Sequence, residues 1–336
     1  MRYRFFVTTA ALAAAAALLV VSTEPARGQA AKAAKPWTQP KTPWGDPDIQ
    51  GTWTSDDCIG TPLQRPATFG DRLYLTEQEL NDKQGKIAQR RKNDLAETVA
   101  ADQRVTTGPP NHWGESARRP CKQTSLIVDP PNGKMPEILA EAKSRPFGNF
   151  NVDRPSSYTD FTYYIRCITR GVPGSIFPVV YGNGQQIVQG KGFVTVLEEM
   201  VHEARVIPVD GRPHASPEIR SYMGDSRGRW EGNTLVVETT NFLGNRTGLV
   251  GNGGGTPTSD ALKTIERFTR ISGDQMQYEI TIDDPKTFAR PFKVAFPLTV
   301  EPGYENFEYA CHEGNNAMFN SLSGARAREK AAAAKK

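Results

Sequence analysis

The most restrictive feature of this 336-residue chain is a series of short β-prone segments that fills its second half. The segments are rich in β-branched and aromatic residues, and glycine, proline or asparagine separates one from the next. Two of them, residues 264–271 and 275–282, flank a short hairpin loop at Ser272, Gly273 and Asp274. Strands at this spacing predict an antiparallel sheet, either closed into a barrel or folded as a sandwich. The predicted strands are residues 163–165, 185–189, 193–209, 234–239, 264–271, 275–282, 292–300 and 306–311.

A Gly-x-Trp pattern occurs twice, at residues 51–53 and 228–230. The pattern resembles the entry motif of lipocalin-like barrels, in which the tryptophan closes one end of the barrel. We therefore expect a mainly β protein built as an antiparallel, lipocalin-like barrel, with a β-sandwich as the alternative.

The first third of the chain is of a different character. Residues 31–50 contain four prolines and predict an extended N-terminal arm. A helix is expected from Thr76 to about Asp102, because Thr76 and Glu79 form a capping box. It has few apolar residues, so it should be peripheral. Residues 51–324 then form one β-rich domain with this helix as an insertion, and residues 325–336 form a disordered basic tail.

Residues 1–30 predict a secretory signal peptide. The chain starts Met-Arg-Tyr-Arg, with basic residues at positions 2 and 4, and continues with an apolar run from Phe5 to Val21. Gly28 and Ala30 then place small residues at the two positions that signal peptidase reads. The run is shorter than the about 20 apolar residues of a membrane-spanning helix. We therefore expect cleavage near Ala30, no stable membrane insertion afterwards, and a periplasmic or secreted mature protein.

The net charge of +4 is concentrated at the ends of the chain. The signal peptide, Lys32, Lys35 and the tail carry the positive excess, and residues 36–324 have a net charge of −4. A nucleic-acid-binding surface needs its lysines and arginines gathered on the folded body. The expected partner is accordingly a small-molecule ligand or substrate, and no nucleic acid.

Four cysteines remain after signal cleavage, and an even number in an exported chain predicts up to two disulfides, with three possible connectivities. They are Cys58, Cys121, Cys167 and Cys311. The sequence has neither the Cys-x-x-Cys nor the His-x-His spacing of a typical metal site, and a chain exported unfolded is not expected to carry a cofactor loaded in the cytoplasm. We therefore predict no metal and no other cofactor; the chemical alternative is a metal site made by His202, His214 and His312.

Several longer stretches resemble a large family of exported bacterial proteins. They are residues 36–48 (PWTQPKTPWGDPD), 199–214 (EMVHEARVIPVDGRPH), 224–232 (GDSRGRWEG) and 308–315 (EYACHEGN). The resemblance covers nearly the whole mature chain. It implies export and a β-rich fold, and it brings no particular activity.

Histidine is the side chain best suited to move protons near neutral pH. In the predicted strand 193–209, alternation puts Glu198 and His202 on one face. Glu199 and Arg205 fall on the other face, and one of the two faces must point into the barrel. A bulge near Glu199 would bring its carboxylate to His202. The chain has only four histidines: His112, His202, His214 and His312.

The turn after that strand and the last predicted strand supply the other candidates. Histidines would act as acid and base, carboxylates would orient them, and an arginine would hold a developing anion. The predicted catalytic residues are His202, His214, Arg205, Glu199 and Asp210. The predicted substrate-binding residues are Arg212, Tyr163, Tyr164, Trp230, His312 and Glu313. The alternative is structural: a solvated polar face, a turn stapled by Asp210 and Arg212, and aromatic residues in the core.

Two functions compete on this evidence. The first is a cofactor-independent enzyme, a lyase, isomerase or hydrolase, acting on a small, partly apolar or aromatic substrate. The second is a periplasmic ligand-binding or carrier protein with the same pocket and no turnover. Convergence of histidine, carboxylate and arginine in one pocket would favour the enzyme, and a purely apolar pocket would favour the carrier.

Overall fold

The computed structural model describes residues 37–100, 114–145, 148, 152–244, 249 and 257–335. The chain divides into two units, residues 1–37 and 38–336, and the second unit is the one described below. The predicted signal peptide, the start of the predicted arm and His112 lie outside the described residues.

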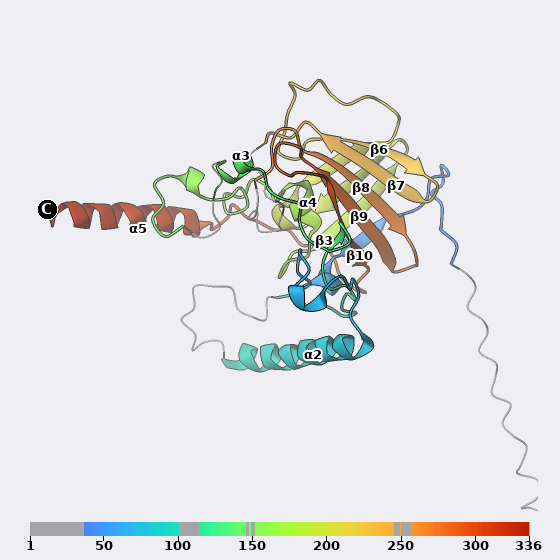
Figure 1. Ribbon diagram of the computed structural model, residues 1–336, viewed down its shortest axis with the longest axis horizontal. Helices are drawn as coiled ribbons and strands as arrows, with labels where there is room; N and C mark the ends of the chain where they lie inside the picture. The colour runs from blue at the N-terminus through green and yellow to red at the C-terminus, as the bar shows by residue number, and fades with distance from the viewer. Residues whose placement is uncertain are drawn as a thin grey trace, which may run out of the picture. The chain divides into compact units, whose positions relative to one another are not determined.

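In the described part of the chain, ten strands form one antiparallel sheet (Figure 1). Nine of them follow one hydrogen-bonded path in the order β5-β4-β3-β1-β10-β9-β8-β7-β6, and β2 pairs with β10. The strands are β1 (Gly51–Thr54), β2 (Ile127–Asp129), β3 (Gly184–Gly190), β4 (Phe193–Glu198), β5 (Ala204–Pro208), β6 (Asp225–Glu231), β7 (Thr234–Thr240), β8 (Lys263–Arg270), β9 (Gln275–Asp283) and β10 (Phe292–Thr299).

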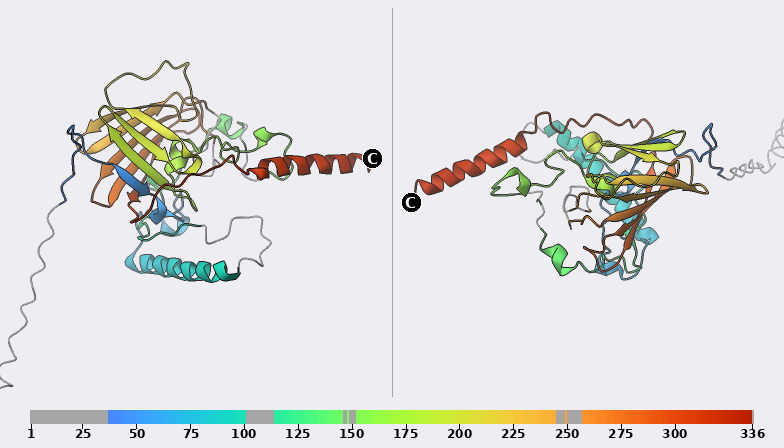
Figure 2. Two further views of the ribbon diagram at one scale, coloured as in Figure 1. Left: turned by 180° about the vertical axis from the view of Figure 1, so that it is seen from behind. Right: turned by 90° about the horizontal axis from the view of Figure 1, so that it is seen from above.

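Helices are few and lie at the periphery of the sheet, as Figure 2 shows for α2 (Glu77–Ala100) and α5 (Asn316–Ala333). The predicted capping box opens α2: the Thr76 amide donates to Glu79 Oε2 at 2.7 Å, and the Glu79 amide donates to Thr76 Oγ1 at 3.3 Å. The other helical elements are α3 (Ala140–Lys143), α4 (Gly171–Ile176) and the short 3₁₀ turns η1 (Asp56–Cys58), η2 (Ala67–Phe69), η5 (Tyr158–Asp160) and η6 (Met200–His202).

Strict alternation of side chains builds the core. Along β9 every second residue is fully buried, from Met276 to Ile282, while its glutamines and Glu279 face outward. Trp53 of the first Gly-x-Trp pattern is also fully buried, and its indole nitrogen donates to the Ile49 carbonyl at 3.1 Å. The predicted hairpin between β8 and β9 is present, since the Ile271 amide donates to the Gln275 carbonyl at 2.9 Å.

The mainly β, antiparallel fold is confirmed, but the sheet does not close into a barrel. Within the described residues no hydrogen bond joins β5 to β6, the two ends of the path. A Cβ on Gly228 of β6 would lie 3.0 Å from Ile207 Cγ2 and 2.7 Å from Val209 Cγ1. Side chains of the β5 segment thus pack on the face of β6. In a closed barrel, the edges of these two strands would be hydrogen-bonded to each other instead. This arrangement fits the sandwich alternative.

The predicted long strand 193–209 is wrong as a single element. It is two strands, β4 and β5, joined by the turn η6, in which Val201 and His202 have positive φ angles of 67° and 31°. The pairing of Val196 with Arg205 places them on the same face of the hairpin. The turn resets the alternation, so Glu198 and Arg205 both point inward.

Three further segments differ from expectation. Residues 163–165 form turns, because the carbonyls of Tyr163 and Tyr164 accept from the amides of Ile168 and Cys167. Residues 306–311 form an extended segment without strand pairing, and the amides of Phe307 and Tyr309 bind the side chains of Glu199 and His202 instead. Most of the tail expected to be disordered is part of α5. Its alanines, arginines and lysines favour helix, and the Arg326 guanidinium donates to the carbonyls of Ser156 and Pro155 at 2.8 and 2.9 Å.

All four cysteines are paired, as Cys58–Cys121 and Cys167–Cys311. This result selects one of the three connectivities that the sequence left open. The first pair is buried beside η1, and the second ties the loop before α4 to the segment after β10. No helix in the described ranges has both the length and the apolar character to cross a bilayer.

Replacing both Cys58 and Cys121 by alanine should lower the free energy of unfolding by roughly 2–5 kcal/mol, because the disulfide constrains the unfolded chain. Denaturant titration of the oxidised mature protein measures the loss. Under a reductant the two proteins should converge, which provides the control. Four reactive thiols in denatured, unreduced wild-type protein would contradict both disulfides.

Candidate functional site

A group of charged side chains is buried inside the folded sheet, near the end of β4. Glu198 of β4, Arg205 of β5 and Glu266 of β8 are 1%, 5% and 0% exposed. Arg170, which precedes α4, is 2% exposed. Alternation explains the first three, since each occupies an inward position of its strand. We call Arg170, Gln185, Glu198, Glu203, Arg205, Thr264 and Glu266 the inner polar cluster.

The firmest contact in the inner polar cluster is a two-pronged ion pair. Arg205 Nη2 lies 2.9 Å from Glu266 Oε1, and Arg205 Nη1 contacts Glu266 Oε2. The hydroxyl of Tyr278 donates to Glu266 Oε1 at 3.0 Å. Burial of a charged pair costs several kcal/mol unless the geometry is good and the remaining lone pairs are used. The guanidinium and the hydroxyl together meet that requirement at Glu266.

Glu198 is the unusual member of the cluster. Neither of its carboxylate oxygens has a hydrogen-bond partner among the described residues. Burial raises the pKa of Glu198 to about 8; the positive charges of Arg205 and Arg170 oppose the rise, and Glu266 adds to it. A carboxyl group with this pKa exchanges its proton near neutral pH, as a general acid or base must.

Other buried polar atoms around Glu198 also lack partners. Gln185 faces Glu198 directly across the β3–β4 pairing, and its Oε1 has no hydrogen bond within the described chain. The same holds for Glu203 Oε2, Thr264 Oγ1 and Arg205 Nε. An unsatisfied buried polar atom costs about 1–3 kcal/mol. The set is dominated by acceptors, so it is suited to a bound polar molecule that carries hydrogen-bond donors.

Glu199, the residue that follows Glu198, belongs to a second group of carboxyl side chains. Asn183 Nδ2 donates to Asp56 Oδ1 at 2.8 Å and to Glu115 Oε2 at 2.9 Å. Burial and the neighbouring Asp56 raise the pKa of Glu115 to about 9. Glu199 accepts from the Gly184 amide at 3.1 Å and from the Tyr304 hydroxyl. We call Asp56, Glu115, Asn183, Glu199 and Tyr304 the outer carboxyl cluster.

An extended segment crosses the turn between β4 and β5, and we call residues 304–315 the strap. Beyond the Tyr304 contact, the Phe307 amide donates to Glu199 Oε1 at 3.4 Å, and the Tyr309 amide donates to His202 Nδ1 at 3.2 Å. The Cys167–Cys311 disulfide fixes its far end. The strap therefore brings Glu199 and His202, two predicted catalytic residues, against the last segment of the sheet domain.

Tyr164 connects the strap to the inner polar cluster. Its ring lies 5.7 Å from the Arg170 guanidinium carbon, and its hydroxyl lies 3.5 Å from the Tyr181 hydroxyl. Burial raises the pKa of Tyr164, with Tyr181 and Tyr309 adding to the effect. The phenol accordingly stays protonated and available as a hydrogen-bond donor.

The remaining predicted site residues lie elsewhere. His214 is held on the outer side of β6 and β7, 2.7 Å from Asp225 Oδ2 and 3.3 Å from Glu238 Oε1. Asp210 and Arg212 form the exposed, stapled turn that was the structural alternative, with Arg212 Nε 2.8 Å from Asp210 Oδ2. His312 and Glu313 are exposed, Tyr163 is buried against Tyr222, and Trp230 packs on the core.

The structure therefore divides the predicted site. Arg205 joins the inner polar cluster, Glu199 and His202 meet under the strap, and His214, Asp210 and Arg212 stay on the outside. Sequence reasoning missed Arg170, Glu266, Glu115 and Asp56. A usable signal existed for Glu266, which is a charged residue at an inward position between Thr264 and Phe268 of a regularly alternating strand.

Comparison with known proteins adds no assignment: the chain matches no protein-family model, no curated protein and no solved structure. In the residues that the structure describes, no group of three or more histidine, cysteine, aspartate or glutamate side chains is arranged to hold a metal ion.

Replacing Glu198 by glutamine should stabilise the protein at alkaline pH. The pKa of Glu198 is about 8 in the folded state and about 4.3 in an unfolded chain. The stability that its protonated form contributes is therefore full below pH 4 and is lost as the pH rises through 8. Glutamine mimics the protonated form, so the variant should gain a few kcal/mol over wild type between pH 5 and pH 9.

Urea unfolding of both proteins at pH 5, 7 and 9 measures this difference. Glu115 keeps its own raised pKa in the variant, so some pH dependence should persist, and Glu115→Gln should remove that part separately. Identical pH slopes for wild type and Glu198→Gln would show that Glu198 is ionised in the folded protein across this range.

Proposed function

We propose that this protein is an exported, cofactor-independent acid/base enzyme that acts on a small molecule at the inner polar cluster. The observation that carries the proposal is Glu198, a fully buried carboxyl group without a hydrogen-bond partner in the described chain, set near two buried guanidinium groups. A structural carboxylate in that position would be bonded on both oxygens. A buried carboxyl group that no protein group bonds is suited to bind a polar group of a substrate.

The chemistry follows from the charges around Glu198. With a pKa of about 8, its carboxyl group is protonated in part of the molecules and ionised in the rest at neutral pH, so it can give or take a proton. Arg170 and Arg205 supply positive charge where a substrate anion would develop. Elimination, isomerisation and hydrolysis all use this combination, so the reaction class is lyase, isomerase or hydrolase.

The predicted residues under the strap have a place in the same proposal. Glu199 and His202 lie beside the inner polar cluster and contact the strap, and Tyr164 lies between the two. We assign them to substrate entry and binding, with Arg205 inside the cluster. For His214 and Asp210 the surface ion pairs support a structural role.

Export is part of the proposal and rests on chemistry independent of the site. Two disulfides in one chain form and persist in oxidising compartments, such as the bacterial periplasm. The basic, apolar and small-residue pattern of residues 1–30 supports the same compartment.

One observation favours the alternative of a carrier without turnover. His202, His214 and His312, the histidines within the described ranges, all lie outside the inner polar cluster. A cluster of buried acceptors binds a donor-bearing ligand whether or not a proton is transferred afterwards. Product formation separates the two functions.

Turnover should depend on the Glu198 carboxyl group. We would incubate the mature protein with a defined library of aromatic and short-chain hydroxy acids, esters and lactones, and follow each compound by mass spectrometry. For any compound that is converted, Glu198→Gln should lower the rate by about 10²–10⁴-fold, the usual contribution of a general acid or base.

Glu231→Gln is the matched control, because Glu231 sits in an exposed ion pair with Arg229 and Arg267 and should leave the rate unchanged. Conversion by Glu198→Gln at the wild-type rate would refute the catalytic role. Retention of a compound without conversion, abolished by Arg170→Met, would establish the carrier.

A further inference from the structure

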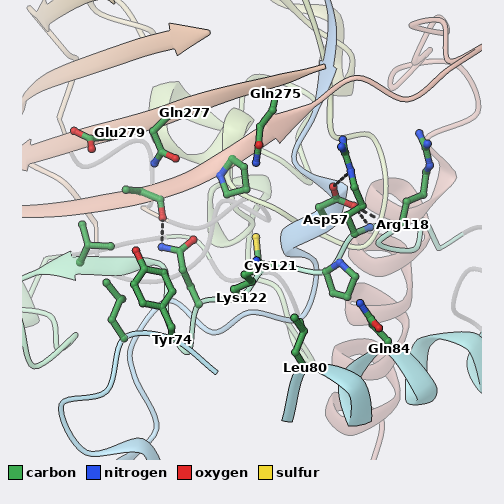
Figure 3. Close-up of a pocket in the computed structure, with 17 residues that line it drawn as sticks. Asp57, Tyr74, Leu80, Gln84, Arg118, Cys121, Lys122, Gln275, Gln277 and Glu279 are labelled. Carbon is green, nitrogen blue, oxygen red and sulfur yellow. Dashed lines mark hydrogen bonds and ion pairs between the residues drawn. The ribbon is translucent and has the colours of Figure 1, made fainter. Parts of the chain in front are cut away.

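A concave site lies on the opposite, outer face of the sheet. It is a groove of about 770 Å³ between the first turns of α2 and the outward face of β9 and β10. Figure 3 shows Gln275, Gln277 and Glu279 along one side of the groove, and Tyr74, Leu80 and Gln84 along the other. The volume falls within the roughly 300–1,000 Å³ typical of small-molecule sites.

Amide side chains are the most frequent polar groups in this groove. Gln275 and Gln277 occupy successive outward positions of β9, so their side chains follow each other along the strand. Gln84 adds a third amide from α2, and Gln123 a fourth from the segment that crosses below. An amide side chain has two N–H donors and one acceptor oxygen. Gln123 and Gln277 each use one N–H group within the protein, on the carbonyls of Ala295 and Tyr278. A row of such groups matches a ligand with many hydroxyl groups.

The positive charges of the groove are only partly neutralised. Arg119 is paired, 2.7 Å from Asp274 Oδ2 and 3.7 Å from Asp57 Oδ2. Arg118 and Lys122 also line the groove, and neither side chain has an ion-pair partner in the described chain. In the described chain, two cations without an ion-pair partner lie beside a row of amides, and together they favour a ligand that carries carboxylates as well as hydroxyl groups.

An exposed aromatic ring completes the lining. Tyr74 is 59% exposed although it borders the groove. Its ring is not needed for the core, and the apolar face of an aromatic ring packs well against the C–H faces of sugar rings. Its hydroxyl has no hydrogen bond to any residue that the structure describes, so it can make a polar contact with a ligand.

We propose that this groove binds an acidic oligosaccharide, with Gln275 and Gln277 on its hydroxyl groups, Tyr74 against a sugar ring, and Arg118 and Lys122 on its carboxylates. A peptide that binds by adding a strand would need a free strand edge, whereas β9 is paired on both sides, with β8 and β10. A single strand of DNA has no hydroxyl groups along its backbone to meet the row of amide side chains, whereas every residue of an acidic oligosaccharide carries them. The site is independent of the inner polar cluster.

Isothermal titration of the mature protein with a trimer of galacturonic acid tests the proposal, with maltotriose as the uncharged comparison. We expect the acidic trimer to bind at least tenfold more tightly than maltotriose. Lys122→Glu should weaken the acidic trimer at least tenfold and leave maltotriose unchanged, while Tyr74→Ala should weaken both. Lys191→Glu, the same charge change in the exposed turn between β3 and β4, is the control and should have no effect.

Three outcomes would overturn the proposal. They are no binding of either trimer, equal loss of binding in Lys191→Glu and Lys122→Glu, and tighter binding of a short oligothymidylate or of triglutamate than of the acidic trimer. The substituted side chains are exposed, so the melting temperature of each variant should match that of wild type and exclude misfolding as a cause.

Discussion

The buried ion pair between Arg205 and Glu266 is the interaction on which the rest of the fold depends. Arg205 belongs to β5, at one end of the hydrogen-bonded path, whereas Glu266 belongs to β8, third from the other end. The pair therefore crosses the interior and joins β5 to β8, two strands that are not neighbours in the hydrogen-bonded path. Breaking such a pair on one side leaves a buried charge and costs about 3–5 kcal/mol. The ion pair thus fixes how β5 and β8 face each other across the interior of the sheet.

The same pair contributes to the electrostatics of Glu198. Burial raises the pKa of Glu198, the charge of Arg205 opposes this rise, and the negative charge of Glu266 adds to it. Glu203, nearby, also has a pKa raised by burial. Three carboxyl groups, those of Glu198, Glu203 and Glu266, thus lie near only two buried guanidinium groups. One carboxyl group has no matching positive charge, and a bound proton neutralises it. The raised pKa of Glu198 is thus a consequence first of its burial and then of the neighbouring negative charge of Glu266.

Local pattern predicted the elements, and long-range contacts decided the site. Period-two alternation predicted β8, β9 and their hairpin, and the capping box predicted α2, because both depend on neighbours in sequence. The turn between β4 and β5 was not predictable in this way. The carboxylate of Glu199, at the start of this turn, is bonded by Tyr304, a residue 105 positions later. The partner of Arg205, Glu266, is likewise 61 positions away in the sequence. The sequence therefore indicated that the segment with Arg205 is polar, but it did not indicate which residues lie opposite.

The position of the histidines changes how acid/base chemistry must be explained in this molecule. Sequence reasoning favoured histidine because its unperturbed pKa is near neutral. The structure instead moves the pKa of a carboxyl group toward that range by burying it. With a pKa of about 8, Glu198 can exchange a proton near neutral pH, as an ordinary histidine does. This solution demands a closed, dry interior, since solvent would return the pKa to its ordinary value. The strap and its disulfide help to provide that closure, which links the fixed path of residues 304–315 to the chemistry that we propose inside.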